Sequence, residues 1–181
     1  MKFKDLDFEI KEVKKQSRLA PNLPDKLKLE KQRKRGLHAL WITPLRALSK
    51  EIHRVTEGVS LDLDLDYQIE LRTGDTSTAV RQKQRKNPPQ ALITTPESVH
   101  LILATKQGQD FFKQLEFIVV DEWHELMGNK RGVQTQLALA RLRHWNPGLV
   151  VWGLSATLGN LVQAREALMP DGVAVEGHVA K

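Results

Sequence analysis

The chain has 181 residues, of which 40% are hydrophobic and 28% charged, with a net charge of +6 and no cysteine. This composition is typical of one globular domain, and it excludes a disulfide framework, a thiolate metal site and a cysteine nucleophile. No apolar run is long enough to span a membrane and the first residues lack a signal-peptide core, so we expect a cytoplasmic protein without membrane contact.

The positive charge is concentrated in residues 1–36. This segment contains 12 Lys and Arg against 6 Asp and Glu, whereas the rest of the chain contains 16 of each. The segment shows no apolar face, although residues 25–35 can form a short helix. A basic run of this kind either lies on a solvated surface or attracts nucleic acid through its phosphates. We therefore separate a basic N-terminal segment, residues 1–36, from a domain over residues 37–170 and a tail over residues 171–181.

Short apolar runs alternate with helical segments after residue 36. We expect strands at residues 37–43, 67–72, 91–94, 117–120 and 149–154. We expect helices at residues 45–55, 79–86, 96–104, 133–145 and 161–168. This alternation predicts an α/β domain with a mostly parallel sheet covered by helices. The strands are apolar on both faces, which is typical of strands covered on both sides, so Trp41 and Trp152 are expected in the core.

Two of the predicted helices follow a Thr-Pro pair. Thr43-Pro44 comes after the first predicted strand, and Thr95-Pro96 comes after the third. Threonine is a common N-cap residue, and proline is favoured at the first helical position. We therefore expect each pair to begin a helix directly after its strand.

Polar motifs follow all five predicted strands. They are TPLR at 43–46, RTGD at 72–75, TTPES at 94–98, DEWH at 121–124 and SAT at 155–157. Each motif by itself can be a structural turn. Ligands of open α/β sheets bind at the carboxyl ends of the strands, and capping alone does not explain a polar motif after every strand. This edge of the sheet is therefore the predicted functional site.

The DEWH motif is the most informative of the five. Asp121 and Glu122 directly follow a buried strand, where two carboxylates are costly unless a positive group meets them. In a nucleotide-hydrolysing site that group is Mg²⁺. The alternative is an ordinary strand exit with solvated acids. A zinc protease is excluded, because an H-E-x-x-H motif starting at His124 needs a histidine where the chain has Gly128.

The order of these motifs resembles the first motor domain of superfamily 2 DExH-box helicases. The likeness covers about residues 37–169 and is nearest to the Lhr-type branch, in particular the bacterial ligase-associated DEXH-box helicases. The segment KRGVQT at 130–135 is similar to the linking segment of that family. The resemblance implies a partial RecA-like motor domain. It also implies ATP-dependent unwinding of nucleic acid, in DNA repair if the ligase-associated branch is correct.

The resemblance also implies roles for single residues. Asp121 would hold Mg²⁺ through water, and Glu122 would lie at the metal and polarise the attacking water. His124, Ser155 and Thr157 would couple the nucleotide to nucleic acid and to a second motor lobe. The implied nucleic-acid face consists of Thr43, Pro44, Arg46, Arg72, Gly74, Thr95, Pro96 and Glu97. The implied cofactors are ATP and Mg²⁺, and the implied partners are nucleic acid, DNA in preference to RNA, and DNA-repair proteins.

The chain departs from the family at one point. Residues 1–60 contain no G-x-x-x-x-G-K-[ST] loop, whose backbone N–H groups and lysine hold the phosphates of the nucleotide. The second motor lobe is not in the sequence either. We therefore expect the chain alone not to be competent in ATP hydrolysis, and a sheet without the strand of that loop to expose an edge or leave a gap. The alternative function is that of a non-catalytic nucleic-acid-binding or regulatory remnant of a helicase.

Overall fold

A computed structural model describes residues 35–63, 67–156 and 160–177. These residues form a five-stranded parallel sheet in the order β2-β3-β1-β4-β5. The strands are β1 (Ala39–Ile42), β2 (Ile69–Arg72), β3 (Ala91–Thr94), β4 (Phe117–Val120) and β5 (Val150–Gly153). The predicted α/β class and parallel sheet are confirmed, and all five strands lie where the apolar runs predicted them.

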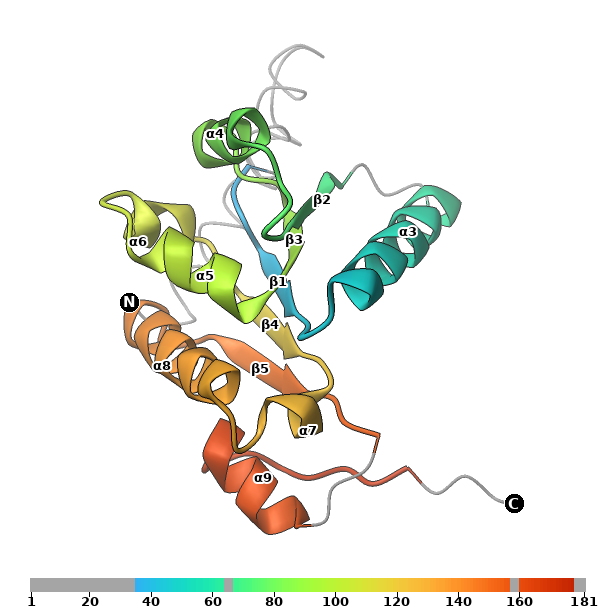
Figure 1. The fold of residues 1–181 in the computed structure, drawn as a ribbon, viewed down its shortest axis with the longest axis vertical. Helices are drawn as coiled ribbons and strands as arrows, with labels where there is room; N and C mark the ends of the chain where they lie inside the picture. Colours follow the sequence, from blue (N-terminus) through green and yellow to red (C-terminus); the bar gives the residue numbers. More distant parts are fainter. Residues whose placement is uncertain (1–34, 64–66, 157–159, 178–181) are drawn as a thin grey trace, which may run out of the picture.

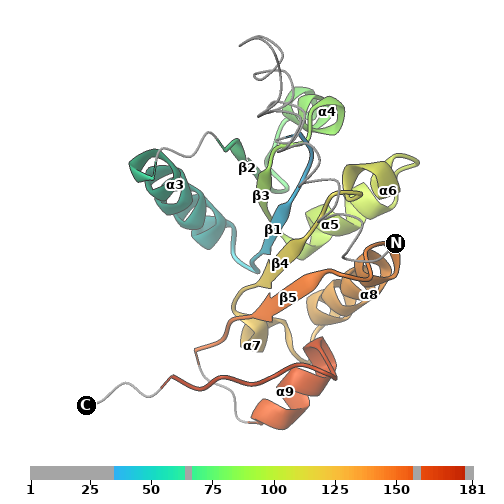
Figure 2. The same cartoon turned by 180° about the vertical axis from the view of Figure 1, so that it is seen from behind.

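Helices flank the sheet on both sides. The described helices are α3 (Arg46–Asp62), α4 (Thr78–Lys86), α5 (Pro96–Leu103), α6 (Gly108–Phe111), α7 (Trp123–Leu126), α8 (Lys130–Trp145) and α9 (Leu161–Leu168). The helix α3 lies on one side of the sheet, and α5, α6 and α8 lie on the other (Figure 1, Figure 2). No helix in the described part of the chain is long and apolar enough to cross a membrane.

Two of these helices were not predicted. The helices α6 and α7 have four residues each, which is too short to show a helical period in the sequence. The possible helix at residues 25–35 falls almost entirely outside the described residues.

The hydrophobic core fills one face of the sheet. Alternate residues of a strand point to the same face, and those of the central strands meet the helices α5 and α8. The buried side chains include Leu40, Ile42, Leu92, Ile118, Val120 and Val151 from the strands, with Val99, Leu103, Leu139 and Leu142 from the helices. This packing holds the carboxyl ends of the strands at one edge of the domain.

The opposite face of the sheet is less covered at β5. Trp152 is 57% exposed, and Trp41 on β1 is half-buried. The expectation that both faces are covered is therefore wrong for β5, and the placement of Trp152 in the core is wrong with it. The physical reason is that α3, the helix on that side of the sheet, packs against β2 and β3 at the other end. The Trp152 ring therefore packs edge to face against Phe117, with ring centroids 5.1 Å apart, and remains exposed.

Candidate functional site

The strand order divides the predicted site into two halves. The DEWH motif follows β4 and Ser155 follows β5, so these residues lie at one end of the sheet edge. The predicted nucleic-acid residues follow β2, β3 and β1, which are adjacent strands at the other end. All thirteen predicted site residues except Thr157 lie in the described part of the chain, and Thr157 lies outside it.

The carboxylate of Asp121 is held by two donors. Its Oδ1 accepts a hydrogen bond of 3.0 Å from the backbone N–H of Glu122. Its Oδ2 accepts one of 3.3 Å from the indole Nε1 of Trp41, on the neighbouring strand β1. The sequence placed Trp41 only in the core, because a contact between residues eighty positions apart leaves no signal in local periodicity. Trp41 is therefore a site residue that the sequence pattern did not reveal.

The backbone turns sharply at Glu122. This residue has φ 48° and ψ 46°, and it is the one non-glycine residue with positive φ in the described part of the chain. The left-handed conformation is uncommon and strained for such a residue, and strain of this kind gathers at functional sites. The turn lets α7 begin at once, so that the N–H of Trp123 donates to the carbonyl of Leu154 at 3.0 Å. The DEWH motif is thereby tied to the end of β5.

Three polar side chains surround His124. Its Nδ1 lies 3.0 Å from Ser155 Oγ and 3.3 Å from Glu122 Oε2, and its Nε2 lies 3.5 Å from Glu125 Oε1. Which ring nitrogen donates depends on the tautomer. The structure thus brings together His124, after β4, and Ser155, after β5. The resemblance implies a coupling role for both residues.

Trp123 connects the DEWH motif to the core. Its side chain is 3% exposed, and its Nε1 donates a hydrogen bond of 2.9 Å to the carbonyl of Ala164 on α9. A buried indole needs such a partner for its N–H. The local sequence pattern does not explain why this position is a tryptophan. The hydrogen bond to the distant Ala164 carbonyl does, because only an indole offers both a large apolar ring and an N–H donor.

The described residues do not by themselves form a metal site with three protein ligands. No group of three His, Cys, Asp or Glu side chains within them is placed to hold a metal ion. Mg²⁺ commonly takes one or two carboxylates from a protein, and water and substrate phosphates fill its other positions. Asp121 and Glu122 supply two carboxylates at one strand end, and each Asp121 oxygen accepts only one hydrogen bond, so this pair fits that kind of site.

Thr43 does not cap the helix that follows it. The helix α3 begins at Arg46 with Leu45 in the N-cap position and no side-chain cap, so the predicted capping by Thr43 is wrong. The N–H of Thr43 instead donates to the carbonyl of Thr94 at 3.0 Å, which continues the β1–β3 ladder. Thr43 and Pro44 are both buried, and the Thr43 hydroxyl has no hydrogen-bond partner. Their side chains face the protein interior.

Thr95 and Pro96 lie where they were predicted. Thr95 is the N-cap residue of α5 and Pro96 holds its first turn, but the Thr95 hydroxyl makes no capping hydrogen bond. That hydroxyl donates to Ser98 Oγ at 3.3 Å. The helices α3 and α5 thus both begin at adjacent strand ends without a side-chain cap.

Arg131 joins three elements of the site. Its Nε and Nη2 donate to the two carboxylate oxygens of Glu97 at 2.5 and 3.3 Å, and Nη2 also donates to the carbonyl of Pro44 at 2.7 Å. Such a bidentate pair is strong and directional. The α8 helix is thereby connected to the TTPES and TPLR motifs. Arg131 was noticed only within the linking segment, because its partners lie far away in sequence.

Burial of Glu97 acts to raise the pKa of its carboxyl group, but the hydrogen bonds, first among them the one from Arg131, outweigh burial and hold it below 4.5. A lowered pKa adds stability above the unfolded-state value, and this stability is lost as the pH falls through the folded-state value. We therefore expect Glu97→Gln to lower the free energy of unfolding at neutral pH, and by progressively less below about pH 4.5.

Urea unfolding between about pH 7 and pH 3 measures this difference. A double-mutant cycle supplies the control, because in an Arg131→Gln background the effect of Glu97→Gln should be small and nearly independent of pH. A difference that persists unchanged at the acidic end would contradict this reading of the Glu97–Arg131 pair.

Arg46 lies over the RTGD turn. Its Nη1 donates to Asp75 Oδ1 at 2.9 Å, and both side chains are mostly exposed. A Cβ on Gly74 would lie 2.9 Å from Arg46 Nη2, so the absence of a side chain lets the guanidinium approach the turn. The structure thus brings together Arg46 and Gly74, which come from different motifs.

Arg72 is buried at the end of β2. It is 5% exposed, and its carbonyl accepts a hydrogen bond of 2.7 Å from Thr94 Oγ1. Burial first, and then the positive charges of Arg81 and Arg85, lower the pKa of the Arg72 guanidinium to about 10. The group therefore remains charged at neutral pH. Arg81 was not expected at the site, yet its Nη2 donates to the carbonyls of Thr73 and Gly74 at 3.3 and 2.8 Å.

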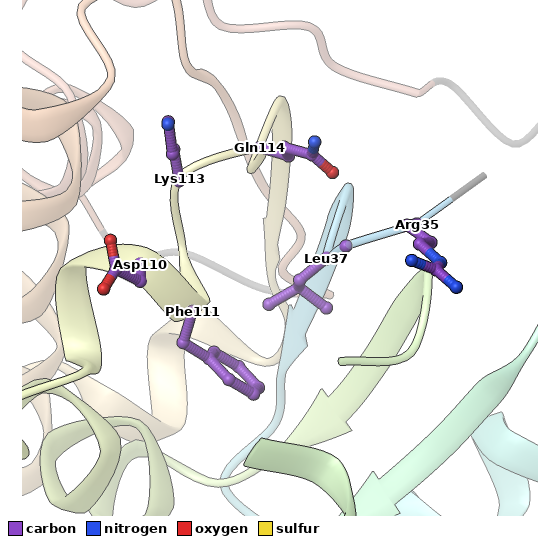
Figure 3. A pocket seen from close by; sticks show the side chains of 7 residues that line it. Arg35, Leu37, Asp110, Phe111, Lys113 and Gln114 are labelled. Atoms are coloured by element: carbon purple, nitrogen blue, oxygen red, sulfur yellow. The ribbon is translucent and has the colours of Figure 1, made fainter. Parts of the chain in front are cut away.

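A separate hollow lies at the opposite edge of the sheet. It is lined by Arg35, Gly36, Leu37, Asp110, Phe111, Lys113 and Gln114 (Figure 3). These residues precede β1 and β4, so they lie at the amino ends of the strands. None of the predicted site residues lines this hollow.

Comparisons with known proteins agree with this arrangement. The family model described as DEAD/DEAH box helicase matches residues 20–164. The ATP-dependent helicase Lhr-Core of Methanocaldococcus jannaschii is 34% identical over 158 residues, which is 81% of this chain and 18% of that protein. The Lhr helicase/uracil glycosylase of Escherichia coli is 32% identical over 62% of this chain and 8% of its own length.

A solved structure gives the same result. The Mycobacterium smegmatis helicase Lhr, bound to ssDNA and AMP-PNP, matches with a TM-score of 0.61 and 30% identity over 72% of this chain and 18% of that one. The chain thus spans less than a fifth of the length of these relatives. The fold is that of a RecA-like helicase domain, and the chain belongs to the DEAD/DEAH box helicase family.

Proposed function

We propose that this chain is a fragment of a DEXH-box motor domain that binds single-stranded nucleic acid, DNA in preference to RNA, along the carboxyl ends of β2, β3 and β1. The observation that carries the proposal is the pair of helices α3 and α5. Both begin at adjacent strand ends and neither has a side-chain cap. Among the described helices of eight residues or more, the other three, α4, α8 and α9, are each capped by a side chain, and only the four-residue helices α6 and α7 also lack such a cap. Free N–H groups at a helix N-terminus favour phosphate.

The predicted side chains take roles that suit this face. Arg46, exposed between the TPLR and RTGD motifs, supplies a positive charge for a phosphate. Thr43, Pro44, Thr95 and Pro96 are buried, so they shape the backbone rather than contact the ligand. Glu97, paired with Arg131, fixes the two motifs relative to each other. Contacts of this type position a strand without reading its sequence.

We also propose that the 181-residue chain does not hydrolyse ATP by itself. The sequence contains no phosphate-binding loop with its lysine. Without that loop, no nucleotide phosphates are held beside Asp121 and Glu122 to complete the coordination of Mg²⁺. In the complete motor these two carboxylates, with His124, Ser155 and Thr157, would serve the nucleotide and its coupling to nucleic acid. The relative from Mycobacterium smegmatis was solved with AMP-PNP, which supports nucleotide binding in the longer protein.

The remaining assignments follow the motifs. Residues 37–170 are proposed as the motor-domain fragment, with the basic segment 1–36 and the tail 171–181 outside it. The residues of the TPLR, RTGD and DEWH motifs favour the bacterial ligase-associated branch. We therefore propose a role in DNA repair, in which a second motor lobe completes the motor. The competing function is that of a non-catalytic or regulatory remnant that takes no part in a longer motor and binds nucleic acid through the basic segment 1–36 together with the Thr-Pro face. The excess of Lys and Arg in that segment favours it.

Fluorescence anisotropy with a labelled single-stranded oligonucleotide tests the binding proposal. We expect salt-dependent binding that survives Asp121→Ala and is weakened by Arg46→Gln, because Arg46 lies on the proposed face and Asp121 does not. The matched control is Arg141→Gln, which removes an exposed arginine from α8. Binding that is lost with Asp121→Ala, or that is absent from the unaltered chain, would overturn the proposal.

A further inference from the structure

Three arginines converge beside the RTGD turn without an acidic partner. Arg81 and Arg85 are four residues apart on α4, so they lie on one face of that helix. Hydrogen bonds from Arg81 and from the intervening Gln84 tie α4 to the end of β2, and the charges of both arginines act on Arg72 there. None of the ion pairs formed between described residues includes any of the three. The Nη1 of Arg72 and the Nε of Arg81 are both buried and have no hydrogen-bond partner.

A buried guanidinium without a counterion is unfavourable. Leaving one charge of a buried pair alone costs several kcal/mol, so a folded domain seldom keeps such a group without compensation. Arg72 is 5% exposed and makes no side-chain hydrogen bond among the described residues that would offset this cost. The arrangement indicates that a bound anion balances the charge of these arginines and accepts hydrogen bonds from them.

A groove lies beside one member of the cluster, Arg85. It is lined by Gln82, Arg85 and Lys86 of α4 and by Gln107, which precedes α6. All four lining side chains are basic or amide, so a negatively charged group that approaches Arg85 meets no carboxylate there.

The position of the cluster selects the kind of anion. Arg81 donates to the carbonyls of Thr73 and Gly74, so the cluster adjoins the turn that also carries Asp75 and meets Arg46. A phosphate bound beside Arg81 would lie next to the face proposed above for the nucleic-acid strand. Guanidinium groups suit phosphate oxygens, since they donate two hydrogen bonds in one plane.

We propose that Arg72, Arg81 and Arg85 form a phosphate-binding site for the sugar-phosphate backbone of single-stranded nucleic acid, which extends the proposed face from the RTGD turn onto α4. This inference rests on the proposed function, because it adds contacts to the same bound strand. It assigns to the two α4 arginines a role that none of the strand-end motifs contains.

The test compares Arg85→Gln with the unaltered chain by anisotropy at several salt concentrations. Arg85 is exposed and makes no described hydrogen bond, so its replacement should leave the fold intact, and a thermal unfolding curve checks this. We expect the Kd for a single-stranded oligonucleotide to rise by roughly tenfold, and the slope of log K against log salt to fall by about 0.7. Arg85→Glu should weaken binding further, and Arg81→Lys should preserve part of it.

Lys113→Gln is the control, because Lys113 is exposed at the opposite edge of the sheet. If the unaltered chain binds the oligonucleotide and Arg85→Gln behaves like Lys113→Gln, this inference fails while the proposed function stands. If the unaltered chain binds no oligonucleotide, the proposed function fails first. Calorimetric titration with inorganic phosphate separates the sources of phosphate: a phosphate affinity lost in Arg85→Gln, with unchanged oligonucleotide binding, would assign the site to free phosphate and overturn the inference.

Discussion

Replacing Trp123 by alanine is expected to lower the free energy of unfolding by about 3–5 kcal/mol. The side chain is 3% exposed within the core, and its Nε1 donates to the carbonyl of Ala164. The substitution would leave a cavity beneath the DEWH motif and remove the hydrogen bond that joins this motif to α9. Urea unfolding followed by far-ultraviolet circular dichroism measures the change.

Trp152 provides the matched control for this prediction. It is also a tryptophan near the same strand ends, but it is 57% exposed and packs mainly against Phe117. Trp152→Ala should therefore cost about 1 kcal/mol or less. If both substitutions cost the same, the assignment of Trp123 to the core and of Trp152 to an open strand face would be wrong.

Replacing Gly132 by alanine is expected to cost about 1–3 kcal/mol or more. A Cβ at this position would lie only 1.9 Å from the carbonyl oxygen of Leu126, which is backbone and cannot rotate away. The first turn of α8 would therefore move from the end of α7, and with it the DEWH motif. Both the free energy of unfolding and the affinity for single-stranded nucleic acid should fall, because Arg131 would shift from Glu97.

Gly58→Ala is the control for the second prediction. Gly58 lies within the α3 helix, and a Cβ there meets no atom within 4 Å. The same chemical change should raise stability by about 0.5–1 kcal/mol, since alanine is the better helix former. If the free energy of unfolding falls with Gly132→Ala and rises with Gly58→Ala, the close approach of α8 to α7 is the cause of the loss at Gly132. A stabilising Gly132→Ala would refute that close approach.

The fold could be predicted from the sequence because its signals are local. Each strand is a short apolar run followed by a polar motif, and parallel strands bring their carboxyl ends to one edge whatever their order. The DEWH motif and Ser155 lie near each other along that edge because β4 and β5 are adjacent in the sheet, which only the structure reveals. The contact of His124 with Ser155 follows from that register.

The contacts that organise the site could not be predicted in the same way. The bond from Trp41 to Asp121 and the pair of Arg131 with Glu97 join residues that are distant in sequence. Thr43 was predicted as an N-cap because threonine is favoured in that position before a helix. In the structure its N–H donates to the carbonyl of Thr94 and continues the β1–β3 ladder instead. The exposure of Trp152 depends on α3 packing over β2 and β3 while β5 lies at the other end of the sheet, and composition carries no information on that order.

We propose that this chain carries the DEXH-box carboxylates without the ability to hydrolyse ATP. The rate of phosphate release from Mg·ATP by the 181-residue chain, with and without single-stranded DNA, tests this proposal when it is compared with the rate of the Glu122→Gln variant. We expect equal rates for the two proteins, at the level of the uncatalysed reaction, under both conditions. A DNA-stimulated rate in the unaltered chain that is abolished by Glu122→Gln would refute the proposal.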